Sequence, residues 1–250
     1  MQAITIPKHS KPDGYELTSV PKPAIISPDE ILIKVHAASI NPVDVKKADG
    51  AFKMALTDTF PYVIGYDASG IVEAVGSSVT LFKAGDDVFV RLPESSRGSW
   101  AEYAVCPERY IAYKPKNLSF GDAASIPLAG LTALQALNEY SGSLEGKTVF
   151  VPAGLGGTGA YALQLAKNVF KASKVITTVS TSKVSKVPEL LGENVVDQII
   201  DYTKDDPLQV IPPRSVDFIF DTTGQAVAFL PLLVKGSGLE LWFGWMEVRH

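Results

Sequence analysis

The sequence predicts an α/β protein with a β-rich domain over residues 1–120 and a nucleotide-binding domain over residues 121–250. From Met1 to about Phe120, short apolar runs are separated by Pro, Gly and Asp turns, a pattern typical of β-strands. After Leu118, apolar residues recur at helical spacing. The segment from Lys147 to Lys167 then reads as a strand, a glycine loop and a helix in that order.

The first region contains several short strands and little helical periodicity. Glu30–Ala38 is the clearest, because Ile31 and Ile33 share one face while Lys34 and His36 share the other. His36 is therefore expected to be an exposed strand residue. Four further strands are expected at Ser69–Val75, Asp87–Arg91, Trp100–Cys106 and Tyr110–Lys114. Together these strands indicate a small barrel-like domain.

The second region alternates helices with short apolar runs. Ser119 is a plausible N-cap for a helix over Phe120–Ala124, and Leu128–Tyr140 gives a second helix. Four strands are expected, at Thr148–Val151, Lys174–Val179, Gln198–Asp201 and Val216–Asp221. Strands that alternate with helices predict a parallel sheet, whose ligand binds at the carboxyl ends of the strands.

The loop between the first of these strands and its helix carries the strongest local signal. Gly154, Gly156 and Gly159 form a G-x-G-x-x-G pattern. We expect the first glycine to allow a tight turn, the second to admit a pyrophosphate close to the backbone, and the third to let the helix pack on the strand. Free N–H groups at the start of the helix would then hold the phosphates. The loop predicts dinucleotide binding.

The residues after the next strand indicate which cofactor is bound. NAD-preferring proteins place an acidic residue there to bind the ribose hydroxyls. This chain instead has Ser180, Thr181, Ser182 and Lys183, whose hydroxyls and ammonium suit the 2′-phosphate of NADPH. A solvated serine-rich loop is the alternative interpretation.

Bulk properties exclude some partners. A net charge of −4 and a pI near 5.4 give no long-range attraction for nucleic acid or an anionic membrane. A single cysteine, Cys106, excludes a disulfide framework, and the N-terminus lacks the apolar core of a signal peptide. A cytoplasmic setting and a small-molecule substrate are the expectation.

Five ordered motifs resemble the zinc-free quinone oxidoreductase and enoyl reductase branch of the medium-chain dehydrogenase/reductase superfamily. They are Asn41-Pro42-Val43-Asp44, Pro61 to Asp67 with Gly70, Phe82 to Val88, Gly98 to Tyr103, and Leu131-Thr132-Ala133. Ala153 to Gly159 also resembles the glycine loop of that family, and the similarity extends to about Leu233. The resemblance implies a GroES-like β-barrel catalytic domain followed by a Rossmann nucleotide-binding domain, with the active site in the cleft between them.

The resemblance also implies site residues in the first domain. Asn41 and Tyr66 are the candidate catalytic residues near the nicotinamide or the substrate oxygen, since both can donate a hydrogen bond. Asn41-Pro42 equally fits a turn before a short helix, and Tyr66 a half-buried aromatic residue. Asp44 and Lys46 are implied on the cofactor side, although Asp44 also suits a helix cap. Asp67 is expected to make a buried structural hydrogen bond.

The implied cofactor is NADPH, held by residues of the second domain. Besides Gly154, Gly156, Gly159 and the loop of Ser180, Thr181 and Lys183, the family pattern implies Thr132, Gly157, Thr158 and Tyr202 as cofactor contacts. The implied activity is hydride transfer to a quinone or an activated C=C bond, and one expected setting is an assembly-line synthase. A non-catalytic NADP(H)-binding protein or an inactive fragment is the alternative.

A catalytic zinc is not expected. The zinc-dependent branch has a cysteine near the position of Asn41 to Asp44 and a His-Glu pair where this chain has Tyr66-Asp67. Zinc needs three protein ligands and an open position. One cysteine and three histidines do not readily supply that set.

The end of the sequence departs from the family pattern. After Leu233 the family has a fifth strand, a sixth strand and a return segment, whereas residues 235–250 read KGSGLELWFGWMEVRH. We expect a Rossmann domain that is truncated or alternatively read at this terminus. A fifth strand left as an open edge predicts association through that edge, or a monomer, where full-length relatives form homodimers.

Overall fold

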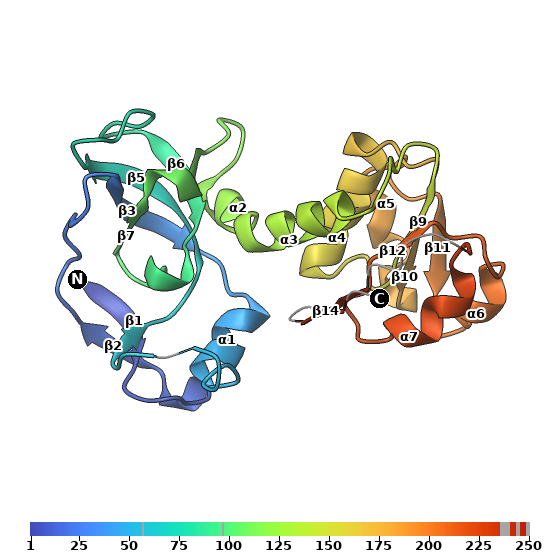
Figure 1. Ribbon diagram of the computed structural model, residues 1–250, viewed down its shortest axis with the longest axis horizontal. Coiled ribbons are helices and arrows are strands. Elements are labelled where there is room, and N and C mark those ends of the chain that lie inside the picture. Colours follow the sequence, from blue (N-terminus) through green and yellow to red (C-terminus); the bar gives the residue numbers. More distant parts are fainter. Residues whose placement is uncertain (57, 97, 236–240, 244–245, 249–250) are drawn as a thin grey trace. The chain divides into compact units, whose positions relative to one another are not determined.

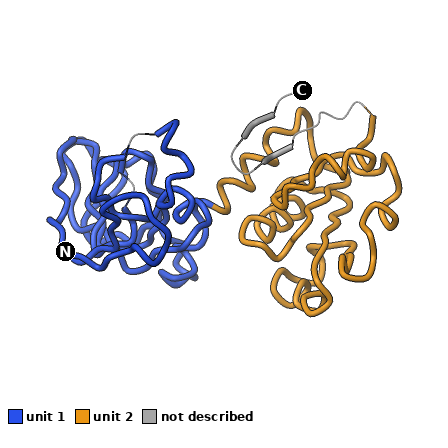
Figure 2. The backbone as a smooth tube through the Cα atoms, turned by 90° about the horizontal axis from the view of Figure 1, so that it is seen from below, with its two compact units in different colours: residues 1–128 blue, residues 129–250 orange. Residues whose placement is uncertain are grey.

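The computed structural model describes residues 1–56, 58–96, 98–235, 241–243 and 246–248, the last two segments by their backbone alone. The chain divides into two compact units, residues 1–128 and 129–250 (Figure 2). Each unit has its own sheets and its own hydrophobic cores. None of the described helices is both long and apolar enough to cross a bilayer.

Unit 1 consists mainly of two antiparallel sheets (Figure 1). The larger has the order β7-β3-β5-β6-β8, with β3 at Glu30–Ala38, β5 at Asp67–Val75, β6 at Asp87–Arg91, β7 at Tyr103–Pro107 and β8 at Ile111–Tyr113. The smaller has the order β2-β1-β4, with β1 at Gln2–Ile6, β2 at Glu16–Ser19 and β4 at Tyr62–Val63. Ile31, Ile33, Val88, Val90 and Cys106 form part of the core inside the larger sheet.

The predicted strand Trp100–Cys106 is divided between these two sheets. Ala101 bridges Ala3, and the N–H of Ile4 donates to the carbonyl of Trp100, so this part joins the smaller sheet. Tyr103–Pro107 pairs with β3 in the larger one. The strand prediction was wrong about continuity because an apolar pattern does not show where a chain changes partner.

The boundary between the units lies after Leu128, whereas the sequence placed it at 120/121. Helix α2 (Phe120–Ala124) belongs to unit 1, because the Ser69 hydroxyl donates to the carbonyl of Phe120 and the ring of His36 stacks on that of Phe120. The Leu128 N–H also donates to the carboxylate of Asp67 at 3.1 Å. The change from strand to helix periodicity in the sequence therefore lies several residues before the boundary between the two units.

Unit 2 is built on a parallel sheet of order β11-β10-β9-β12. These strands are β9 at Thr148–Val151, β10 at Lys174–Val179, β11 at Gln198–Asp201 and β12 at Phe218–Ile219. The first three coincide with the predicted ranges. The helices are α3 (Pro127–Asn138), α4 (Gly157–Gln164) with a π-helical turn at Leu165–Val169, α5 (Lys186–Leu191), α6 (Pro207–Val210) and α7 (Ala226–Phe229).

Alternate residues of the sheet pack against different helices. Val149 and Val151 belong to a core with residues of α3 and α4. Phe150 belongs to a second core, with Ile211 after α6 and Phe229 of α7. Both faces of the sheet are thus covered, which explains why its strands read as continuous apolar runs.

The predicted fifth strand does not extend this sheet among the described residues. Leu241–Phe243 (β13) and Met246–Val248 (β14) instead pair with each other in antiparallel register. Among the described residues, β12 is the last strand on its side of the sheet, and Val216 just before it forms a parallel bridge with Leu233. Gly244 and Trp245, part of the unusual terminal sequence, lie outside the described residues.

Candidate functional site

The glycine loop follows β9 at the carboxyl edge of the parallel sheet. The residue with a left-handed backbone is Ala153, at φ 53°, and none of the three motif glycines has a positive φ. The turn that this residue starts, in which the Gly156 N–H donates to the Ala153 carbonyl at 2.8 Å, therefore contains Gly154 without a left-handed backbone at that glycine. A Cβ on Gly154 would lie 2.0 Å from Oγ1 of Thr177 on β10, so this glycine permits close packing of the loop on the neighbouring strand.

The other loop glycines divide into two kinds. A Cβ on Gly159 would lie 2.7 Å from the Ala153 carbonyl oxygen, so Gly159 lets α4 approach the strand as predicted. Gly156 is the N-cap residue of α4, and Gly157 has open space around its Cα. The first N–H groups of a helix lack intrahelical partners, so Gly157, Thr158 and Gly159 present donors suited to a pyrophosphate.

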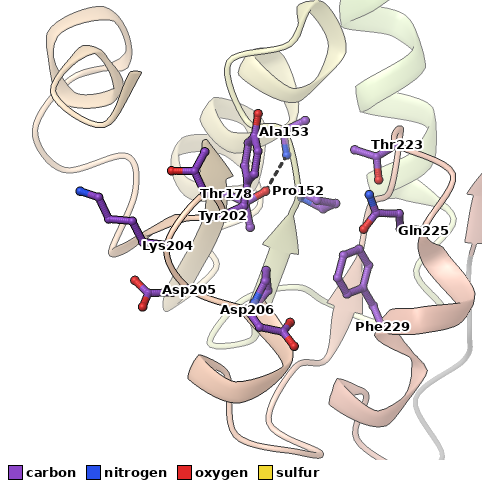
Figure 3. Close-up of a pocket in the computed structure, with 12 residues that line it drawn as sticks. Pro152, Ala153, Thr178, Tyr202, Lys204, Asp205, Asp206, Thr223, Gln225 and Phe229 are labelled. Carbon is purple, nitrogen blue, oxygen red and sulfur yellow. Dashed lines mark hydrogen bonds between the residues drawn. The ribbon is translucent and has the colours of Figure 1, made fainter. Parts of the chain in front are cut away.

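A pocket of about 600 Å³ lies at the same edge of the sheet. Figure 3 shows Pro152 and Ala153 in its middle, with Tyr202 on one side and Gln225 and Phe229 on the other. Its remaining lining comes from Thr178, Thr203, Lys204, Asp205, Asp206, Pro207 and Thr223. Of the predicted cofactor residues, Tyr202 lines this pocket. The lining mixes apolar with polar groups, as is common in sites for small molecules.

The loop after β10 lies beside the end of β11. Ser180 precedes a 3₁₀ turn at Thr181–Lys183, and Lys183 is exposed. The Thr181 hydroxyl donates to the carboxylate of Asp201 at 2.6 Å. Tyr202 is 55% exposed, so its ring is accessible from solvent. The structure thus brings Thr181 and Tyr202 to one end of the edge, as the sequence predicts.

Asp201 is a residue that the sequence interpretation missed as part of this site. The rule for cofactor choice looks for an acid after the second strand, whereas Asp201 ends the third. Parallel register places Asp201 opposite Val179, the last residue of β10. Aligning the ends of the two predicted strands would have shown this proximity.

Two other residues at the edge differ in their placement. Asp221, after β12, is buried, and its carboxylate accepts hydrogen bonds from the N–H and hydroxyl of Thr223, which shapes the pocket wall. Thr132 lies half-buried on α3 and does not line the pocket. Its predicted cofactor contact stays a prediction.

In unit 1, Asn41 links two buried carboxylates. Its side-chain amide donates to Asp67 at 3.0 Å and to the Ser39 hydroxyl at 3.1 Å. Its backbone N–H donates to Asp44 at 2.6 Å, so Asp44 caps helix α1 (Pro42–Ala48). The predicted helix cap and the predicted buried hydrogen bond of Asp67 are both present. Both N–H groups of the Asn41 amide are therefore used within the protein.

The two carboxyl groups titrate far from their ordinary range. Burial raises the pKa of Asp44 to about 7, against the lowering effect of hydrogen bonds from the backbone of Asn41 and Tyr66. Burial also raises the pKa of Asp67 to about 6, opposed by hydrogen bonds from Asn41, Leu128 and Ser39. One oxygen of each carboxyl has no hydrogen-bond partner among the described residues. Loss of hydration on burial thus outweighs the hydrogen bonds that favour the two charged forms.

Tyr66 belongs to a chain of polar groups that begins in the core of unit 1. Its hydroxyl donates to Glu94, whose other oxygen lies 3.1 Å from Nζ of Lys47. Lys47 is also 3.0 Å from Asp58, which in turn lies 2.9 Å from Nε2 of His9. Tyr66 is buried, and this network provides a hydrogen-bond partner for its hydroxyl.

The neighbouring lysines of α1 have opposite environments. Lys46, the predicted cofactor residue, is exposed. Lys47 has a side chain only 2% exposed and is neutralised by Asp58 and Glu94. Lys46 is therefore the one with an ammonium available to an anionic ligand.

The cysteine and the two histidines of unit 1 lie in separate environments. Cys106 is buried in the barrel core, and burial raises the pKa of its thiol to about 12. His9 is paired with Asp58, while His36 stacks on Phe120. Over the described ranges, no group of three His, Cys, Asp or Glu side chains is arranged to hold a metal ion. The residues at the position of the zinc ligands, Tyr66 and Asp67, are committed to other partners.

Comparison with known proteins agrees with this arrangement. A family model described as the alcohol dehydrogenase GroES-like domain matches residues 27–116. A 2-methylene-furan-3-one reductase of Solanum lycopersicum is 39% identical over 98% of this chain and 62% of its own length. An NADPH-dependent alkenal/one oxidoreductase of Arabidopsis thaliana is 41% identical over 85% of this chain and 54% of its own. The chain thus spans less than two thirds of these curated relatives.

A solved structure matches most of the chain. The quinone oxidoreductase of Coxiella burnetii is 36% identical, with a TM-score of 0.80 over 93% of this chain and 72% of that protein. Because it covers 93% of this chain, the match extends over both units. This chain therefore belongs to the medium-chain dehydrogenase/reductase superfamily, among its quinone oxidoreductase-like members.

Proposed function

We propose that the protein is a zinc-independent, NADPH-dependent oxidoreductase that reduces a quinone or an activated C=C bond. The observation that carries this proposal is the pocket at the carboxyl edge of the sheet, next to a glycine loop whose packing excludes a Cβ at Gly154 and Gly159. The relatives named for NADPH-dependent alkenal/one reduction and for quinone reduction support the substrate class.

NADPH fits the residues present in unit 2. The first N–H groups of α4 would hold the pyrophosphate, and Tyr202 would lie against the adenosine. Lys183, exposed at the end of its 3₁₀ turn, would pair with the 2′-phosphate. When bound, the cofactor supplies a hydride, so the protein needs only to position an electron-poor acceptor and polarise its oxygen.

Tyr66 is the better candidate of the two predicted catalytic residues. If Asn41 donated to a substrate oxygen, the buried carboxylate of Asp67 would lose a donor, at a cost of roughly 1–3 kcal/mol. If Tyr66 turned its hydroxyl to a substrate, Glu94 would keep Lys47, and the 39% exposed Glu94 side chain would regain water. Asn41 is then a residue that positions the start of α1.

Cofactor binding is tested first, because it does not depend on the substrate. Lys183→Ala should weaken NADPH binding roughly tenfold or more, which corresponds to the loss of one charge-assisted contact, and leave NADH nearly unchanged. Lys186→Ala is the matched control, since Lys186 is exposed at the start of α5 outside the loop. Equal affinity for both cofactors in the unmodified protein would contradict the 2′-phosphate assignment.

Turnover is tested by the oxidation of NADPH with an α,β-unsaturated ketone, an α,β-unsaturated aldehyde and a quinone. A saturated ketone is the control, and we expect no oxidation with it because it lacks an activated double bond. Tyr66→Phe should lower kcat/KM more than it lowers the stability of unit 1, whereas Asn41→Ala should act mainly on stability. Tight NADPH binding without turnover on any acceptor would instead favour a cofactor-binding protein.

A further inference from the structure

Asp201 is held against the loop that the proposed function assigns to the 2′-phosphate. It is the last residue of β11 and lies opposite Val179 in the parallel register with β10. The chain leaving β10 reaches Thr181 two residues later, and the two side chains are in direct contact. Asp201 is thus an acidic group in contact with the loop to which the proposed function assigns the 2′-phosphate, next to Tyr202 and Thr203 of the pocket lining.

Its carboxylate is surrounded by donors. One oxygen accepts the Thr181 hydroxyl at 2.6 Å and lies 3.3 Å from Nζ of Lys204. The other accepts the Thr203 hydroxyl at 2.7 Å and the Thr203 N–H at 3.1 Å. The two hydroxyls lower the pKa of Asp201 to about 2, so the group is ionised at neutral pH.

This arrangement fixes the direction of the two hydroxyl protons. A threonine hydroxyl has one proton and two lone pairs. The hydroxyl oxygens of Thr181 and Thr203 lie 2.8 Å apart, but the carboxylate is the stronger acceptor for both protons. Thr181 therefore offers lone pairs, rather than a proton, to a ligand at this loop.

A ligand with a 2′-hydroxyl and one with a 2′-phosphate meet this loop differently. The 2′-hydroxyl of NADH can donate to a lone pair of Thr181. The 2′-phosphate of NADPH needs donors and is repelled by the Asp201 charge, which Lys204 offsets only in part. Lys183 attracts the phosphate from the same turn, so attraction and repulsion act on it at one position.

We infer that Asp201 is a specificity-determining residue that narrows the preference for NADPH over NADH, by repelling the 2′-phosphate and by holding the Thr181 proton. The inference rests on the proposed cofactor binding at this edge. The usual rule looks for the acidic residue that affects cofactor choice after the second strand, whereas Asp201 ends the third strand, β11. It also revises Thr181 from a phosphate donor to an acceptor.

The test compares dissociation constants of NADPH and NADH in the full chain and in Asp201→Asn, which keeps the shape of the side chain and removes its charge. The ratio of the NADH to the NADPH constant should rise roughly three- to tenfold, and the same rise should appear for 2′,5′-ADP relative to ADP. Raising the salt to about 1 M should shrink the change, because the screening length falls to about 3 Å. A purely structural role would not produce this salt dependence.

Asp205→Asn is the matched control, since Asp205 lines the same pocket and is exposed. Its carboxylate is not hydrogen-bonded to Thr181, and the ratio should change less than in Asp201→Asn. An unchanged or falling ratio in Asp201→Asn overturns the inference while leaving the proposed function standing. Failure of the unmodified protein to bind either cofactor overturns both.

Thr181→Val provides a second test should Asp201→Asn not fold. This change removes the hydroxyl lone pairs on an exposed turn. It should weaken NADH more than NADPH, because the acceptor for the 2′-hydroxyl is lost. A larger loss for NADPH would show that the hydroxyl donates to the 2′-phosphate, and it would overturn the inference.

Discussion

The buried carboxyl pair of unit 1 should make its stability fall as the pH rises. Asp44 and Asp67 are 1% and 0% exposed, and their pKa values are raised to about 7 and about 6. An acid whose pKa is raised by folding stabilises the protein below its unfolded pKa, near 3.8, and this stability is lost as the pH rises through the folded pKa. Asp44→Asn removes the titrating group and keeps its shape.

The size of the effect follows from the two pKa values. Between about pH 5 and pH 8, Asp44 should cost about 3 kcal/mol of unfolding free energy and Asp67 about 1 kcal/mol. Asp44→Asn should therefore flatten the fall from about 4 to about 1 kcal/mol. The charge of Asp67 helps to raise the pKa of Asp44, so the two groups are coupled. Asp67→Asn should therefore also lower the pKa of Asp44.

Cys106 provides the assay. It is the single cysteine of the chain and lies fully buried in the core of unit 1. The extent to which Cys106 reacts during a brief pulse of thiol reagent is measured at increasing urea concentrations. Dividing it, at each pH, by the extent of reaction of the fully unfolded protein gives the unfolded fraction of this unit. Asp49→Asn is the control, because Asp49 is exposed at the end of the same helix. An equally steep pH dependence in Asp44→Asn and in the unmodified protein would refute the reasoning.

Three further predictions concern packing, burial and metal content. Gly154→Ala should prevent cofactor binding or destabilise unit 2, because its Cβ would lie 2.0 Å from Oγ1 of Thr177. Gly157→Ala is the control and should be tolerated, because a Cβ there would lie in open space. Equal melting temperatures and equal NADPH affinities in the two variants would contradict this prediction. Lys47→Ala should cost about 3–5 kcal/mol in urea unfolding by leaving Asp58 with less compensation, while Lys46→Ala, on the exposed side, should change stability by less than about 0.5 kcal/mol. Elemental analysis of dialysed protein should find no stoichiometric zinc, and a chelator should leave the melting temperature unchanged.

The sequence predicted the parallel sheet of unit 2 better than the barrel of unit 1. Thr148–Val151 and Lys174–Val179 are buried on both faces, so their apolar runs begin and end with the strands. Gln2–Ile6 and Glu16–Ser19 were not predicted. No residue of Glu16–Ser19 is buried, so its sequence lacks the apolar pattern of a strand. This strand forms by pairing with Gln2–Ile6, a contact that the residues of Glu16–Ser19 alone do not indicate.

The candidate site shows a similar division. The glycine loop was recognised because its glycines lie close together in the sequence, whereas the packing of Gly154 against Thr177 on β10 was not predicted. The contact of Thr181 with Asp201 joins residues 20 positions apart, and the contact of His9 with Asp58 joins residues 49 positions apart. Nothing in the local pattern distinguishes Lys47 from Lys46, although one is buried and the other exposed. Which polar groups are buried could therefore be determined only from the structure.

The cost of burying Asp67 raises the question of what its carboxylate contributes. One oxygen accepts donors from Ser39 after β3, Asn41 before α1 and Leu128 in the first turn of α3. It therefore ties three segments to β5, including the segment that carries the predicted catalytic residue Asn41. An apolar side chain of similar size would remove the desolvation cost, but it would leave three donors without their acceptor. The destabilising charge at neutral pH is thus coupled to the placement of this segment, which accounts for an acidic residue at a position that hydrophobicity alone would fill with an apolar one.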